Sequence, residues 1–104
     1  MALVLIGRCG LDLYEHAGNA GDRFQPTRTG LDHLAFVANT LEDLNAWAAW
    51  LDSHQVPHSE IRDVVGAGTM FDLVDPDGIQ IEFFFVDDER LRRSDLFWAV
   101  TEAR

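Results

Sequence analysis

The sequence lacks lysine altogether, contains a single cysteine and has no long apolar run. The lone cysteine, Cys9, excludes an intrachain disulfide and a CxxC metal pair, which favours a reducing, cytoplasmic setting. Residues 1–6 are apolar, but no basic leader precedes them and the run stops at Gly7, so we expect no signal sequence. No apolar stretch approaches the roughly 18 residues of a membrane helix, so we expect no membrane partner.

Basic side chains are also scarce. The 104 residues include 8 basic residues, all of them arginine, against 18 acidic ones, which gives a formal net charge of −10. A negative field of this size repels nucleic acid and anionic lipid, so we expect neither as a partner. Hydrophobic residues make up 47% of the chain and charged residues 25%, which is typical of a globular domain rather than a disordered segment. The length predicts a single domain with one modest core.

Glycine and proline divide this domain into four segments. Residues 1–16 hold two short apolar runs, 3–6 and 11–16, around a glycine-containing turn, which predicts a β-hairpin. Residues 17–30 carry three glycines and a proline and are predicted to be a linker. Residues 87–104 are predicted to form a C-terminal helix. The segment between linker and helix, residues 31–86, carries the strongest signals.

Residues 31–86 predict the order strand, helix and three further strands. The strand at residues 31–37 has alternating faces, with Leu34 and Phe36 on one of them. Thr40 is a typical helix N-cap, and apolar residues recur at three- and four-residue spacing up to Leu51. Extended segments follow at 58–64, 69–74 and 79–86. The turn Asp75-Pro76-Asp77-Gly78 connects the last two.

His33 and Glu82 form a candidate functional pair on the first and last of these strands. A glutamate among aromatic residues is costly to bury unless a partner such as a divalent cation neutralises it. Imidazole and carboxylate on neighbouring strands are ordinary ligands of zinc, iron, manganese or nickel. The alternative is that both are surface residues on a solvated sheet face. The spacing alone does not exclude this, because two ligands far apart in sequence are a weak pattern for a metal site. The residues that share their predicted strand faces are Ala35, Val37, Gln80 and Phe84.

Other polar groups carry weaker signals. His54 and His58 flank Pro57, which argues against one helix presenting both as a metal pair, so we expect surface histidines. Asp72 lies opposite Glu82 if the hairpin closes at residues 75 and 79. In that position Asp72 is either an assisting or catalytic acid or a solvated carboxylate.

Two stretches and the Leu/Trp helix between them resemble the vicinal oxygen chelate superfamily: residues 30–36 (GLDHLAF) and residues 75–83 (DPDGIQIEF). That superfamily includes glyoxalase I, fosfomycin- and bleomycin-resistance proteins, methylmalonyl-CoA epimerase and extradiol dioxygenases. The resemblance covers residues 31–86 well and residues 3–16 loosely. It implies an α+β fold: one complete βαβββ module of the glyoxalase/bleomycin-resistance type, preceded by the remnant hairpin of a first module and followed by a C-terminal helix.

The resemblance also implies a metal site. In that superfamily two modules form a cupped sheet, with ligands on the first and last strand of each module. His33 and Glu82 match the second module's ligands of a divalent ion such as zinc, nickel, iron, manganese or cobalt. The first module's last-strand ligand falls on Asp12 or on Tyr14, depending on the alignment, and His16 shares their strand parity. Its first-strand ligand has no counterpart, so the site is either incomplete or completed by another chain.

Three functions are compatible with this resemblance. The first is a metal-dependent lyase, isomerase or dioxygenase acting on a small substrate with vicinal oxygens. The second is a metal-free, resistance-type module that binds a small ligand, and the third is an incomplete member without activity. Tyr14 joins Ala35, Val37, Gln80 and Phe84 as expected substrate contacts. Because the reduced first module leaves an open sheet face and an apolar hairpin edge, we predict a homodimer with twofold symmetry.

Overall fold

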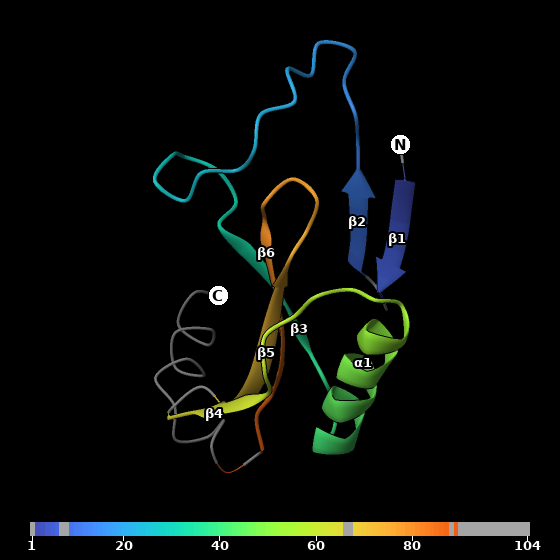
Figure 1. Ribbon diagram of the computed structural model, residues 1–104, viewed down its shortest axis with the longest axis vertical. Helices are drawn as coiled ribbons and strands as arrows, with labels where there is room; N and C mark the ends of the chain where they lie inside the picture. Colours follow the sequence, from blue (N-terminus) through green and yellow to red (C-terminus); the bar gives the residue numbers. More distant parts are fainter. Residues whose placement is uncertain (1, 7–8, 66–67, 88, 90–104) are drawn as a thin grey trace.

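The computed structural model describes residues 2–6, 9–65, 68–87 and 89 (Figure 1). In these ranges the order is β1 (Ala2–Ile6), β2 (Cys9–Leu13), β3 (His33–Val37), α1 (Leu41–Ser53), β4 (Arg62–Val64), β5 (Gly68–Val74) and β6 (Gln80–Phe85). The predicted α+β class and the βαβββ order from β3 to β6 are confirmed. The predicted C-terminal helix at residues 87–104 lies outside the described residues except for Asp87 and Glu89.

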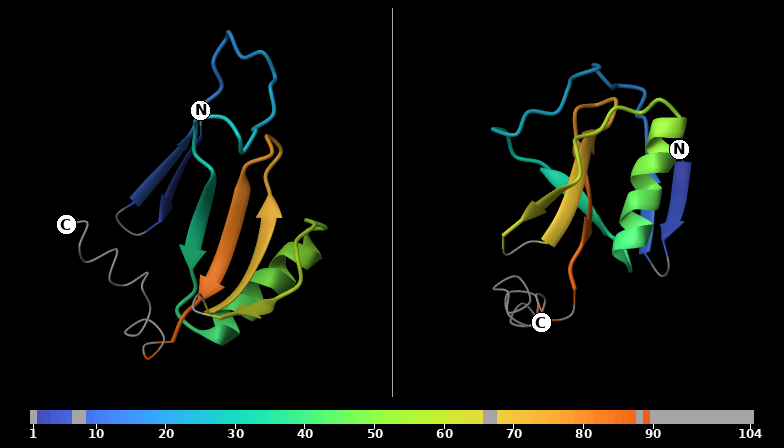
Figure 2. Two further views of the ribbon diagram at one scale, coloured as in Figure 1. Left: turned by 90° about the vertical axis from the view of Figure 1, so that its left-hand side faces the viewer. Right: turned by 60° about the horizontal axis from the view of Figure 1, so that its bottom comes forward.

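The last four strands form one sheet in the order β3-β6-β5-β4. Strands β3 and β6 run parallel, whereas β6, β5 and β4 pair antiparallel. Parallel neighbours need a long crossover, which α1, β4 and β5 supply. The left view of Figure 2 shows α1 against one face of this sheet only. The opposite face carries no helix in the part of the chain that the structure describes.

The helix begins and ends with recognisable caps. Thr40 is extended, with φ −138°, and its Oγ1 accepts a hydrogen bond from the Asp43 amide at 3.0 Å, as predicted. At the other end Gln55 takes a left-handed φ of 57°, and the Val56 amide donates to the Leu51 carbonyl at 3.0 Å. This is a Schellman-type ending, which turns the chain back toward the sheet.

The core lies between α1 and the two central strands. Leu44 of α1 and Phe71 of β5 are fully buried, and Phe71 stacks on Phe83 of β6 with ring centroids 5.2 Å apart. Burying one such side chain contributes about 1.5–3 kcal/mol. Phe83 also contacts Trp47 of α1 at 5.3 Å. The apolar face of β6 therefore points to the helix, and its polar face points away from it.

The β5–β6 turn sets the register of the sheet. The Asp75 amide donates to the Ile79 carbonyl at 2.9 Å, and Gly78 takes a φ of +91°. Asp75 Oδ1 also accepts from the Ile79 amide at 2.8 Å, which fixes the turn from within. Asp72 consequently lies opposite Glu82, as predicted.

The N-terminal hairpin forms a separate two-stranded sheet. Its pairing runs from Ala2 with Leu13 to Ile6 with Cys9, so β2 begins and ends earlier than the predicted strand at residues 11–16. The difference arises because Cys9 already pairs with Ile6, and the last pair joins Leu13 to Ala2, the first residue of β1. No helix among the described residues is long and apolar enough to span a bilayer.

Candidate functional site

The candidate site lies on the sheet face that α1 does not cover. On β3, His33, Ala35 and Val37 are exposed, whereas Leu34 and Phe36 alternate with them and are half-buried. The register places His33 beside Gln80 and Ala35 beside Glu82 on the parallel strand β6. Strand alternation thus brings the two predicted metal ligands and four predicted substrate contacts to one face: His33, Glu82, Ala35, Val37, Gln80 and Phe84.

His33 and Glu82 face each other directly. Nε2 of His33 lies 3.7 Å from Oε2 of Glu82, and their side chains are 42% and 18% exposed. This distance is too long for a direct hydrogen bond. Two ligands that each bind one tetrahedral ion at about 2.1 Å lie about 3.4 Å apart. Donor types and spacing therefore fit a divalent cation held between the two side chains.

Neighbouring residues hold both side chains. Nδ1 of His33 lies 2.7 Å from Oδ2 of Asp32, and Nε2 of Gln80 donates to Oε1 of Glu82 at 3.1 Å. The hydrogen bond to Asp32 is the main cause that raises the pKa of His33, with a further contribution from the charge of Glu82, while burial opposes the rise. Sequence reasoning missed Asp32; its position directly before the strand histidine was the available signal.

The described residues do not complete a metal site by themselves. No third His, Cys, Asp or Glu within them joins His33 and Glu82 in a group that could hold an ion. Asp12 is exposed on β2, in the separate two-stranded sheet. Tyr14 and His16 follow β2 and contact each other, with ring centroids 4.4 Å apart. The structure therefore brings the two predicted second-module ligands together but not the first-module candidates; the metal-binding roles of all of them stay predictions.

Asp72 has partners of its own on β4 and in the segment just before it. Its Oδ2 lies 2.6 Å from Nη2 of Arg62, and its amide donates to Oγ of Ser59 at 2.9 Å. Arg62 also donates to that Ser59 oxygen at 2.9 Å. Asp72 is thus neutralised by a cation of β4 rather than solvated alone.

His58 is more buried than the sequence predicts. Its side chain is 12% exposed, and its ring lies 5.0 Å from that of Phe71 in the core. Nδ1 is 2.7 Å from the Ser59 carbonyl oxygen, and Nε2 is 2.9 Å from Oδ1 of Asp52. The carbonyl, followed by Asp52, raises the pKa of His58 against the effect of burial. His54, by contrast, is exposed and stacks on Trp50.

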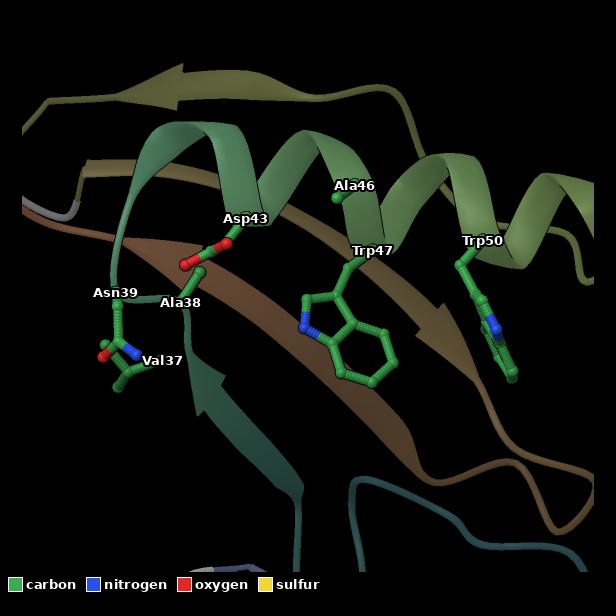
Figure 3. A pocket seen from close by; sticks show the side chains of 7 residues that line it. All are labelled: Val37, Ala38, Asn39, Asp43, Ala46, Trp47 and Trp50. Atoms are coloured by element: carbon green, nitrogen blue, oxygen red, sulfur yellow. The ribbon is translucent and has the colours of Figure 1, made fainter.

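A cavity of about 500 Å³ lies elsewhere, at the corner between β3 and α1 (Figure 3). Figure 3 shows the rings of Trp47 and Trp50 extending from α1 on the same side as Asp43, near the end of β3. Trp47 and Trp50 are 46% and 51% exposed, and their ring centroids lie 5.9 Å apart. Of the predicted substrate contacts, Val37 lines this cavity. An apolar surface thus flanks the edge strand β3 on the helix side.

Comparisons with known proteins agree with this architecture. The family model described as Glyoxalase/Bleomycin resistance protein/Dioxygenase superfamily matches residues 2–83. A solved glyoxylase/bleomycin resistance protein/dioxygenase domain from Frankia sp. EAN1pec is 28% identical, with 69% of this chain and 56% of that chain covered and a TM-score of 0.61. A lactoylglutathione lyase from Agrobacterium tumefaciens is 18% identical, with 69% and 52% covered and a TM-score of 0.49.

A genomically encoded fosfomycin resistance protein, FosX, from Listeria monocytogenes is 20% identical, with 66% and 52% covered and a TM-score of 0.49. None of the curated proteins matches the chain. The chain spans about half the length of the solved structures that it matches. With the family model covering most of its residues, the chain belongs to the glyoxalase/bleomycin resistance protein/dioxygenase superfamily.

Proposed function

We propose that the chain is a metal-binding subunit whose open sheet face forms half of a divalent-cation site for a small substrate with vicinal oxygens. The observation that carries this proposal is the imidazole–carboxylate pair of His33 and Glu82, which face each other at 3.7 Å across adjacent strands. Members of the superfamily often use divalent metals. The single cysteine, Cys9, supports a reducing, cytoplasmic setting for this subunit.

The chemistry follows from the residues of this face. A cation bound there would supply Lewis-acid chemistry for a substrate with two neighbouring oxygens, as in a lyase, isomerase or dioxygenase of this type. His33 and Glu82 would hold the ion. Ala35, Val37 and Phe84 on the same face would contact the carbon skeleton and displace water from it. A small, partly apolar molecule with a few oxygens is the substrate class that fits.

A second copy of the chain completes the site in this proposal. Zinc in proteins takes four ligands, and the described face provides two. An equivalent pair from a twofold-related copy would bring the number to four. Strand β3 lies at the edge of its sheet, and the exposed rings of Trp47 and Trp50 lie beside that edge. Asp12 lies in the other sheet, so it could serve as a ligand only if such an assembly brought it to this face.

Metal titration tests the proposal. Protein purified without added metal should bind zinc, nickel or manganese at one ion per assembled site, measured by calorimetry. His33→Ala and Glu82→Ala should each abolish binding, because each removes one of the two donors. Glu15→Ala is a matched control, because Glu15 is an exposed carboxylate outside the face, and it should bind like the wild type. Unchanged binding in both site variants would refute the assignment.

A metal-free module that binds a small apolar or aromatic ligand is the second candidate. The apolar side chains Ala35, Val37 and Phe84 around the pair favour it. The same titration separates the candidates: such a module binds no ion in the presence of intact His33 and Glu82. An incomplete member without activity would bind neither metal nor ligand.

A further inference from the structure

Each candidate ligand has one polar atom engaged by a neighbour and one left facing the other ligand. Nδ1 of His33 is engaged by Asp32 at 2.7 Å, and Oε1 of Glu82 is engaged by Gln80 at 3.1 Å. The remaining atoms, Nε2 and Oε2, face each other at 3.7 Å. Within the described residues no hydrogen bond engages either of them. The protein thus leaves open the two atoms that a shared cation would need.

We propose that Asp32 and Gln80 are positioning residues, which select the donor atoms of His33 and Glu82 and aim them at one shared cation. This inference rests on the proposed metal-binding function and assigns two further residues to it. Neither is a ligand in this arrangement. Asp32 lies on the far nitrogen of the ring, and Gln80 offers an N–H donor rather than a lone pair.

Asp32 decides which ring nitrogen carries the proton. A carboxylate only accepts hydrogen bonds, so Nδ1 of the neutral His33 ring must donate to it. The ring's one proton then resides on Nδ1, and Nε2 keeps the free lone pair that binds a metal. Asp32 can reach the ring of the next residue because β3 begins at His33. Inside a strand the two side chains would point to opposite faces.

Gln80 orients the carboxylate in the same way. It lies two residues before Glu82 on β6, so both side chains are on one face, and it pairs across the sheet with His33. Its amide must donate to the carboxylate, which cannot donate in return. Holding Oε1 on one side turns Oε2 toward the imidazole. Both ligands are therefore oriented before an ion arrives, which lowers the entropic cost of binding it.

The first test of this inference needs no metal. In apo protein labelled with nitrogen-15, at a pH where the ring is neutral, His33 should show the Nδ1–H tautomer; a His33→Gln variant assigns its signals. Asp32→Ala should shift the ring to the Nε2–H tautomer. Asp32→Asn, whose amide oxygen still accepts, should retain the Nδ1–H form. Asp22→Ala is the matched control, because Asp22 is an exposed carboxylate in the segment between β2 and β3.

The second test measures zinc affinity by calorimetry. Losing the outer partner of a metal-binding histidine lowers metal affinity about 10- to 100-fold, which is the loss expected for Asp32→Ala. Asp32→Asn should lose less, which separates the hydrogen bond from the charge. Gln80→Ala should also weaken binding, whereas Gln25→Ala, in the exposed linker, should not. Circular dichroism checks that each variant is folded.

The outcomes distinguish this inference from the proposed function. A wild-type protein that binds none of zinc, nickel and manganese refutes the proposed function, while the tautomer of His33 in Asp32→Ala still decides the role of Asp32 in the apo protein. An unchanged tautomer in that variant overturns the inference. Where the wild type binds zinc, unchanged affinity in both Asp32→Ala and Gln80→Ala overturns it as well.

Discussion

Replacing Gly68 by alanine should destabilise the four-stranded sheet. Gly68 is the first residue of β5 and has a φ of +97°, a conformation that side-chain-bearing residues rarely adopt. An added Cβ would clash with the carbonyl oxygen of Phe85 on β6 and lie 3.0 Å from Cγ2 of Val86. Because the nearest atom belongs to the backbone, relief requires β5 to move away from β6. That strand pair is the one that carries Glu82.

The magnitude follows from two separate costs. A left-handed φ costs a residue with a Cβ about 1–2 kcal/mol. Forcing an extra carbon into a packed region costs typically about 1–3 kcal/mol. The free energy of unfolding should therefore fall by roughly 2–5 kcal/mol out of the 5–15 kcal/mol typical of a domain. Each kcal/mol lowers the Tm of a domain near this size by about 4–8 °C.

Urea unfolding followed by circular dichroism measures this loss, with two other glycine-to-alanine variants as controls. Gly18 has no heavy atom within 4 Å of an added Cβ, so Gly18→Ala should change stability little. Gly21 has a φ of +74° and equally open surroundings, so Gly21→Ala isolates the backbone cost. A loss in Gly68→Ala no larger than that in Gly21→Ala would refute the clash with Phe85.

Two further predictions concern pH and assembly. Because the Ser59 carbonyl and Asp52 raise the pKa of His58, the stabilisation from its protonated form should be complete below about pH 6.5 and lost as pH rises through the folded-state pKa. Urea unfolding at several pH values should show this loss of unfolding free energy in the wild type but not in His58→Gln. If the unfolding free energy of both proteins changed equally with pH, the prediction would be contradicted. Replacing Trp47 and Trp50 together by serine should convert the proposed dimer to a monomer near 11.7 kDa in sedimentation at micromolar concentration. A wild type that is already monomeric there would refute the proposed interface.

Turn chemistry carried most of what the sequence could predict about the site. The Asp75-to-Gly78 turn has a fixed length, so it sets the β5–β6 register and places Asp72 opposite Glu82. Strand alternation then assigns Glu82 and His33 to a face. The turn length and the strand alternation each depend on a few neighbouring residues. They therefore predict the same register and the same faces wherever the hairpin forms.

Contacts between distant segments could not be predicted in this way. The burial of His58 depends on Phe71 and Asp52, which approach it only after α1 has packed on the sheet. The role of Asp32 depends on β3 beginning at His33 rather than two residues earlier, and strand ends are the least certain part of a sequence prediction. The position of Asp12 depends on how the hairpin sits in the assembly, for which the chain offers no local signal.

For the proposed metal site, the layout of the sheet indicates from which side further donors would come. Glu82 is on the inner strand β6, and its neighbour on the far side, Asp72, is already held by Arg62 at 2.6 Å. The near side is β3, which has no outer strand partner in the described sheet. A strand added there would lie about 4.8 Å from β3 and its donors within reach of His33. The proposed twofold-related copy would meet this requirement and would cover Trp47 in the same step. In this arrangement two chains share one ion, so calorimetry should give one zinc per two chains, and one zinc bound per monomeric chain would contradict the shared site.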